Sequence, residues 1–521
     1  MTRLVPPSNL ERQTPTDCDM LPRRRIPPTL GTSPLAARLL RSGRRWYARV
    51  AQMAFLASLA ATAEAQTAAP QPPSPPAPAR TTRPDYRNLR FDEVWLSQHR
   101  SAEWGDAIKA IPLAPALTLT LGGQLRWREE FFREFNMTGA SDDHAQSRLL
   151  LSADLHVGAR ARWHGRLFAE GRDAQSYGRT LPGGVRPTDE DRHDAQNLFA
   201  DVAHGASFVR YGRQEIVLNR ERLFGVPDWA NTRRGSQGTR VHLERSRLAL
   251  EAIDARPVSV FQHRANRADS TQRFRLLSLG SAAGAARLAP GLPSVWQGYW
   301  IQQTVRTPTA ETRRTTSGGR TMWQWGVPSG TRRYGLELEG AVQRGTSGTR
   351  DVDAWFRVAE ASVQWPLRRG APTLALGVEE ASGENQATGQ TAEVFTALYP
   401  AAHAHGGYAD VIGRANVREW HAIGTWDPVN AVALRWAWYR FDRLRVDEGI
   451  YNKQNVVFRA ASGSAQRHAA DEVDVTGTWR ASRHWRVIAG AAVVLPGAFM
   501  TETPGGATTE RWGFVGTAFT F

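Results

Sequence analysis

From Leu117 to the end of the chain, apolar and polar residues alternate along many short segments. In residues 117–128 the odd positions are apolar or glycine, and most of the even positions are Thr, Gln or Arg. Because a strand sends successive side chains to opposite faces, this period of two predicts strands with one apolar and one polar face. The same pattern recurs in residues 148–157, 163–172, 333–343, 432–439 and 473–480.

Several of these segments have tryptophan at or near an end, and the chain itself ends on an alternating strand, RWGFVGTAFTF, that finishes at Phe521. A soluble β-sandwich also alternates, but it buries its apolar face against a second sheet. Long strands with interfacial tryptophans are typical of a membrane barrel. Residues 117–521 hold 16 to 18 strands if each strand and turn uses about 22 to 25 residues. We therefore predict an all-β fold: a transmembrane antiparallel β-barrel of about 18 strands, with an open lumen and a short N-terminal periplasmic or plug segment.

The N-terminal region has the pattern of an export signal. Arg44, Arg45 and Arg49 precede the apolar residues 50–63, and the AEA sequence at residues 63–65 predicts cleavage after Ala65. An N-terminal anchor helix is the alternative. Export and the barrel pattern together predict the cell outer membrane, with outer-membrane lipid and lipopolysaccharide as surroundings. The predicted organisation is an N-terminal extension and signal peptide (1–65), a Pro/Ala-rich linker (66–84), a preamble (85–116) and the barrel (117–521).

The amino-acid composition excludes several kinds of site and partner. Cys18 is the only cysteine and precedes the predicted cleavage site, which excludes disulfide scaffolds, thiolate nucleophiles and cysteine-based metal sites from the exported chain. The formal net charge is +16, and Lys109 and Lys453 are the only lysines among 66 basic residues. Guanidinium groups are permanently charged and bind carboxylates in a bidentate manner. A nucleic-acid binder would also be basic, but the export signal and the interleaved acidic residues argue against one.

Many arginines fall on the polar faces of the predicted strands, where residues that line a lumen belong. Unpaired and converging at a constriction, they would form an electropositive path for anions. Acidic residues share these faces, so the alternative is that the arginines mainly brace the wall through cross-strand ion pairs. Residues 208–217 carry charge on both faces, which predicts a place near a rim. The predicted lumen-facing candidates are Arg126, Arg128, Arg148, Arg166, Arg172, Arg213, Arg240, Arg333, Arg435 and Arg480.

The sequence contains few residues in patterns typical of metal binding or catalysis. Asp189, Glu190 and Asp191 form an acidic run, interpreted either as a solvated loop or as a Ca²⁺-binding or gating element. Two His/Asp clusters, residues 142–144 and 403–410, have no supporting metal-ligand spacing, and the common catalytic motifs are absent from the sequence. We therefore predict neither an enzyme nor a cofactor.

Six sequence blocks resemble the alginate export family of outer-membrane porins, in family order. They are NLRFDEVW (88–95), LTLTLGGQLRWREE (117–130), RPTDEDRHD (186–194), RYGRQE (210–215), NTRRGSQGTRV (231–241) and FTALYP (395–400). The resemblance implies a monomeric 18-stranded barrel with an arginine-lined pore through which an anionic polyuronate (alginate-like) chain leaves the periplasm.

The closing strand in turn resembles those of bacterial outer-membrane barrels, whose terminal Phe, here Phe521, is read by the assembly machinery. In the preamble, Phe91 and Trp95 are candidates for docking at the periplasmic mouth. We expect the pore to pass anionic polysaccharides or oligosaccharides. The alternative is a general small-solute porin with paired charges and no selectivity for polyuronates.

Overall fold

The computed structural model describes residues 84–93, 95, 103–158, 162–282, 291–326, 332–385, 389 and 391–521. The predicted export signal and its cleavage site lie outside the described residues. The preamble forms two short 3-10 turns, η2 (Arg90–Asp92) and η3 (Trp104–Ile108), and the strand β1 (Ile111–Ala114). None of the helices in the described part of the chain is long and apolar enough to cross a membrane.

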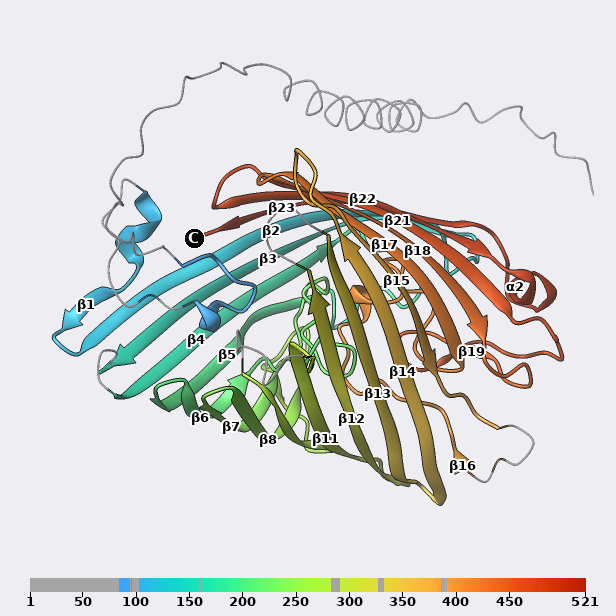
Figure 1. Cartoon of the computed structure of the whole chain (residues 1–521), viewed down its shortest axis with the longest axis horizontal. Coiled ribbons are helices and arrows are strands. Elements are labelled where there is room, and N and C mark those ends of the chain that lie inside the picture. Colours follow the sequence, from blue (N-terminus) through green and yellow to red (C-terminus); the bar gives the residue numbers. More distant parts are fainter. Residues whose placement is uncertain are drawn as a thin grey trace, which may run out of the picture. The chain divides into compact units, whose positions relative to one another are not determined.

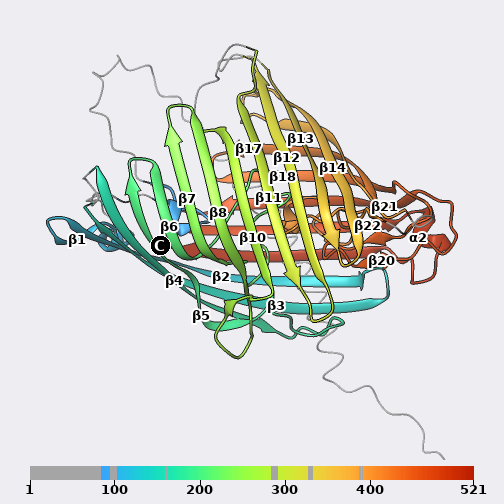
Figure 2. The ribbon, with the colours of Figure 1, turned by 90° about the horizontal axis from the view of Figure 1, so that it is seen from below.

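Eighteen antiparallel strands form a closed barrel, which confirms the predicted fold class (Figures 1 and 2). Each strand pairs with the next along the chain, and β2 also pairs with the last strand, which closes the sheet. The strands are β2 (Leu117–Phe135), β3 (Ala140–Val157), β4 (Trp163–Tyr177), β5 (Asp191–His204), β6 (Ser207–Gln214), β7 (Ser236–Arg245), β8 (Leu248–Ser259), β10 (Gln272–Ser281), β11 (Val295–Arg306), β12 (Glu311–Trp325), β13 (Arg333–Ser347), β14 (Arg350–Gln364), β15 (Thr373–Ala381), β17 (Val417–Val429), β18 (Val432–Arg443), β21 (His468–Arg480), β22 (Trp485–Pro496) and β23 (Glu510–Thr520).

The two ends of the barrel differ in their connections. The end at which β2 begins and β23 finishes has mostly short turns, such as residues 205–206 and 246–247. The opposite end, here called the long-loop end, carries most of the long connections, and outer-membrane barrels direct such loops outside the cell. Short elements occur within these loops: β9 (Arg267–Ala268), β16 (Thr391–Ala392), η4 (Ala402–Ala404), β19 (Ile450–Tyr451), β20 (Val457–Arg459) and α2 (Ala498–Glu502).

The predicted alternation corresponds to an outer and an inner face. On β2, Leu125 is 51 % exposed whereas its neighbour Arg126 is buried. Leu167 and Leu198 on β4 and β5 are likewise exposed, 55 % and 58 %, and point away from the lumen. The apolar residues therefore form the lipid-facing wall, and the polar residues line the interior.

The chain terminus completes the seam between β2 and β23. The amide N–H of Phe521 donates to the Gly123 carbonyl at 3.0 Å, and the Gly123 amide donates to the Phe521 carbonyl at 2.9 Å. A side chain at Gly123 would place its Cβ 2.6 Å from the Phe521 ring, so the close approach needs glycine. Next to it, Trp104 stacks on Phe519 with ring centroids 5.9 Å apart, and β1 pairs with the start of β2. Recognition of Phe521 by the assembly machinery stays a prediction.

Candidate functional site

Three long connections fold into the barrel from the long-loop end. We call them loop 215–235, loop 382–416 and loop 444–467 after their residues, and Figure 1 shows green and orange loop traces within the ring of strands. Their apolar side chains pack against the wall: Phe224 contacts Phe274 of β10 at 4.7 Å and Tyr399 of loop 382–416 at 5.0 Å between ring centroids. The lumen is therefore partly filled by the chain's own loops.

Three of the predicted arginines hold loop 215–235 against β2 and β3. Arg126 donates to the Asp228 carbonyl and Arg128 to the Trp229 carbonyl, each at 2.6 Å. Arg148, whose side chain is fully buried, donates to the Asp228 carboxylate at 2.8 Å. These arginines lie on the inner face, as predicted, but their hydrogen bonds go to a loop of the same chain.

Asp228 joins this loop to two guanidinium groups. Its carboxylate pairs with Arg148 and lies 3.4 Å from Arg233 of the same loop. Burial alone would raise the pKa of Asp228, but the two arginines hold that pKa well below its usual range. Arg233 also forms a buried ion pair with Glu215 at 2.5 Å. A network of charges thus fixes the inward position of the loop.

From the opposite end, the N-terminal segment, of which residues 84–93 and 95 are described, enters the lumen. Phe91 is buried edge-on against Phe168 of β4 and Phe199 of β5, with centroids 5.8 and 5.5 Å away. Arg166, another predicted lumen residue, binds Asp154 at 2.7 Å and donates to the Phe91 carbonyl at 2.8 Å. The segment is therefore held by strands on the inner face of the wall.

The N-terminal segment and loop 215–235 touch each other. The guanidinium group of Arg233 donates to the main-chain carbonyl of Asn88 at 2.9 Å. On the seam side, Arg90 pairs with Glu93 at 2.6 Å and donates to Thr520 of β23 at 3.4 Å. The N-terminal segment and loop 215–235 thus form two layers of chain in mutual contact inside the lumen.

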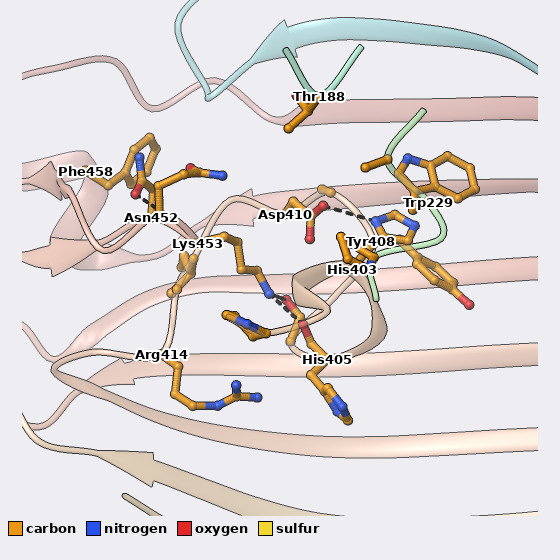
Figure 3. Close-up of a pocket in the computed structure, with 18 of the residues that line it drawn as sticks. Thr188, Trp229, His403, His405, Tyr408, Asp410, Arg414, Asn452, Lys453 and Phe458 are labelled. Carbon is orange, nitrogen blue, oxygen red and sulfur yellow. Dashed lines mark hydrogen bonds and ion pairs between the residues drawn. The ribbon is translucent and has the colours of Figure 1, made fainter. Parts of the chain in front are cut away.

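On the long-loop side lies a chamber of about 680 Å³ (Figure 3). His403 stacks on Trp229 with centroids 4.3 Å apart, and its ring pairs with Asp410 at 3.1 Å. Lys453 donates to the carbonyl oxygens of His405 and Gly406 at 2.6 and 2.9 Å. Loops from three parts of the chain therefore share this chamber.

The charges that line the chamber are close to balance. Arg128 pairs with Glu130 at 2.7 Å, whereas Arg179 and Arg186 share Asp189 at 3.3 and 2.9 Å. The cationic lining residues are Arg128, Arg179, Arg186, Arg234, Arg414 and Lys453, and the acidic ones are Glu130, Asp189, Glu379, Asp410 and Glu419. Six cations against five acids leave a small positive excess if the histidines are neutral.

Two of these cations donate to main-chain carbonyls and form no ion pair among the described residues. Arg234 donates to the carbonyl oxygens of Gly225 and Pro400 at 3.3 and 3.1 Å, and burial lowers its pKa to about 10. Lys453 is the other. Burial, together with two nearby arginines, holds the pKa of His405 well below its usual range, so this ring is neutral. Arg234, Lys453 and one of the two arginines that share Asp189 therefore lack a carboxylate of their own, whereas Asp410 and Glu419 pair with His403 and His421. The net excess is one positive charge.

The other candidate arginines divide into paired inner residues and residues placed elsewhere. Arg172 pairs with Asp191, and Arg240 binds Glu251 at 2.7 Å. Arg435 donates to the Tyr439 hydroxyl at 2.7 Å. Each of these three lies on the inner face with a partner on the wall.

Three candidates differ from the prediction. Arg213 is opposite Leu198, so it belongs to the outer face, where it binds Asp194 at 2.7 Å; it does not line the lumen. Arg333 and Arg480 are exposed residues at the first position of β13 and the last of β21, so both lie at the short-turn rim of the barrel and not within the lumen. The short β6 explains the first error: it carries arginines on both faces, and the alternation rule does not tell which face is inner.

The carboxylates of the acidic run are paired with arginine side chains. Asp189 binds Arg186 and Arg179, and Asp191 binds Arg172. Glu190 lies 3.7 Å from Arg192. Across the described residues, no group of three His, Cys, Asp or Glu side chains is arranged to hold a metal ion. The acidic residues therefore serve to fix this part of the chain through ion pairs.

One feature of the sequence other than alternation pointed to the chamber, namely the rarity of lysine. In a chain whose basic residues are almost all arginine, Lys453 lines the chamber and Lys109 is buried beside the N-terminal segment. Lys109 donates to the Leu121 carbonyl at 2.7 Å, and burial lowers its pKa to about 8. Asp228, Trp229 and Arg234 gave no such signal, because irregular loops have no period.

A carboxyl group between two of the loops predicts a dependence on pH. Glu448 is buried and accepts hydrogen bonds from the Glu384 amide at 2.6 Å and from the Tyr451 hydroxyl. Burial raises its pKa to about 7. Because the folded loop holds the proton more tightly than an open loop with an ordinary pKa, the stabilisation is complete below about pH 4.5 and is lost as the pH rises toward 7, on the order of 3 kcal/mol.

We therefore expect the amide of Glu384 to exchange hydrogen faster as the pH rises from 5 to 7, after correction for the intrinsic rate. Glu448→Gln should remove that dependence, because the amide cannot ionise. Glu502→Gln, at an exposed carboxylate in a neighbouring loop, is the matched control. A pH dependence that persists in Glu448→Gln would contradict the assignment to this group.

The model of the Alginate export family matches residues 117–514. The barrel is similar to the Pseudomonas aeruginosa outer membrane protein OpdK, at 14 % identity over 77 % of this chain and 98 % of that chain, with a TM-score of 0.52. The crystal structure of OpdK with vanillate gives 13 % identity, the same coverage and a TM-score of 0.52. OccK3 (OpdO) from the same organism gives 14 % identity over 77 % and 95 % of the two chains, with a TM-score of 0.51.

These structural likenesses concern the fold alone. Among curated proteins, no match was found. The family and the fold are those of a transport barrel, not of an enzyme. Since the family model matches most of the chain, this protein belongs to the alginate export family of outer-membrane β-barrel porins, located in the cell outer membrane.

Proposed function

We propose that this porin passes anionic sugars or polyuronate chains, and that the positive excess of the chamber selects them. The observation that carries the proposal is the excess of one cation among the lining charges, together with the bonding of these cations: Arg234 and Lys453 donate to main-chain carbonyls, and Arg179 and Arg186 share Asp189. Charges in a confined space with little water are screened less than charges on a surface. Carboxylates of a uronate would supply the missing partners.

A general small-solute porin is the second candidate. The near balance of six cations and five acids favours it, since paired charges create little net field. OpdK, of similar fold, has been crystallised with vanillate, a small carboxylate. In that case the chamber would accept small anions without preference for a polymer.

Reversal potentials in planar bilayers separate the two candidates. We expect the wild-type barrel to prefer anions at low salt and to be blocked by oligouronates. Lys453→Gln combined with Arg234→Gln should reduce both effects, whereas Lys453→Arg should retain the anion preference. Arg480→Gln, which removes an exposed charge at the rim, is the matched control. Absence of anion preference in the wild type at low salt would leave the general porin as the function.

A further inference from the structure

Five arginines gather on the outer face of the barrel at the long-loop end of β8, β10, β11 and β12, which lie side by side in Figure 2. On β10, Arg273 and Arg275 alternate with Phe274 and Leu276, which are buried on the inner face. The two arginines therefore point away from the lumen. The five, here called the outer arginine patch, are Arg256, Arg273, Arg275, Arg306 and Arg313.

Strand register brings these side chains together. Arg273 is opposite Thr304 on β11, which is opposite Arg313 on β12. Strands are about 4.8 Å apart, so Arg273 and Arg313 are separated by roughly 10 Å at the backbone. The patch, with neighbouring hydroxyl and amide side chains, lines a shallow pocket of about 230 Å³. It thus combines guanidinium groups and hydroxyl groups around one concavity.

The patch has a clear excess of positive charge. Asp254 is shared by the two arginines of β10, and Glu311 lies 2.8 Å from Arg306 and 3.3 Å from Arg313. Two carboxylates therefore face five arginines. The four paired arginine side chains are 47 to 64 % exposed, and exposed ion pairs of this kind are weak and exchange readily.

The position of the patch along the barrel axis indicates which layer of the membrane it faces. Leu277 and Leu279 continue the same face of β10 and are 47 % and 45 % exposed, as lipid-facing residues are. Arg275 is two residues from Leu277, or about 7 Å along the strand. On β11, Trp300 occupies the same face two residues from Gln302. The patch therefore lies just beyond the apolar belt, at the level of the outer leaflet's headgroups.

We infer that the outer arginine patch binds the phosphate groups of a phosphorylated glycolipid of the outer leaflet. Guanidinium forks match phosphate oxygens in a bidentate manner, and five of them serve more than one phosphate. The apolar belt directly below accommodates the acyl chains of the same molecule, which a free phosphate ion would leave unused. The site lies outside the lumen, so it is independent of the solute that the pore passes.

Binding of lipid A to the purified, delipidated barrel in detergent tests this inference by native mass spectrometry. We expect affinity to fall in the order of two, one and no phosphates on the lipid. The variant Arg256→Gln/Arg273→Gln/Arg275→Gln should bind the diphosphorylated lipid about tenfold more weakly for each guanidinium group that would bind phosphate. Inorganic phosphate should compete only at far higher concentration than the lipid.

The matched control is Arg344→Gln/Arg357→Gln/Arg440→Gln, which removes three outward arginines that pair with Asp353, Glu380 and Asp442 on other parts of the wall. It should bind like the wild type. Equal loss in both triple variants, or equal binding of lipids with and without phosphate by the wild type, would overturn the inference. If inorganic phosphate competes as strongly as the lipid, the patch is a phosphate site and the glycolipid assignment is wrong.

Discussion

Removal of residues 84–95 is expected to raise the single-channel conductance of the barrel several-fold. In the structure this segment lies in the lumen, where Phe91 packs against Phe168 and Phe199 and Asn88 touches loop 215–235. Without it, water and ions gain the space that it fills. Planar bilayer recordings of the deletion variant measure the change directly, and mobility shifts on heating show whether the barrel is still folded.

The point variant Phe91→Ala should act in the same direction, because it removes the ring that packs against Phe168 and Phe199 and so weakens the hold on the segment. Trp104→Ala is the matched control, since Trp104 belongs to the same N-terminal region but stacks on Phe519 and is 58 % exposed. It should leave conductance unchanged. A deletion variant that conducts like the wild type would show that residues 84–95 do not obstruct the pore.

The second large effect is expected at Asp228. Asp228→Ala leaves the fully buried Arg148 without its carboxylate, and an unpaired buried charge costs on the order of 3 kcal/mol. Loop 215–235 should then leave its inward position for part of the time. We expect faster hydrogen exchange in this loop and frequent switching between conductance levels in bilayer recordings.

The double variant Asp228→Asn/Arg148→Met tests the cause, because it removes both charges and keeps most of the volume. It should restore much of the protection that Asp228→Ala removes. Arg240→Met, whose ion pair with Glu251 braces the wall and not the loop, is a control for general loss of charge. If the double variant is as mobile as Asp228→Ala, the ion pair is not what holds the loop.

Alternation located the barrel well, because a lipid face and a water face impose the same rule on every strand. It predicted shorter strands than the structure has: the segment predicted to end at Arg128 continues to Phe135, and the one that begins at Arg148 starts at Ala140. The extra residues project beyond the lipid. There both faces meet water or other loops, so the sequence is no longer constrained to alternate.

The site was predicted only in part. Arg126, Arg148 and Arg166 lie on the inner face, and besides nearer partners such as Asp154 they bind main-chain carbonyls 102, 80 or 75 positions away. Such pairings depend on how the loops fold back, which the sequence does not show. The prediction that acids and arginines brace one another describes Arg240 and Glu251 well. A role of any of these arginines in selecting a solute stays a prediction.

The hydrogen bond between Arg90 and Thr520 has a consequence for the order of folding. These residues are 430 positions apart, and the Thr520 hydroxyl also accepts a hydrogen bond from Gln124 of β2. Contacts between distant parts of a chain form late, because a long loop must first close at an entropic cost. The N-terminal segment gains its partner on β23 only after the first and last strands have met. The hydrogen bond between Arg90 and Thr520 can therefore form only after the ring of strands has closed. A nascent barrel would remain open until its final strand is in place.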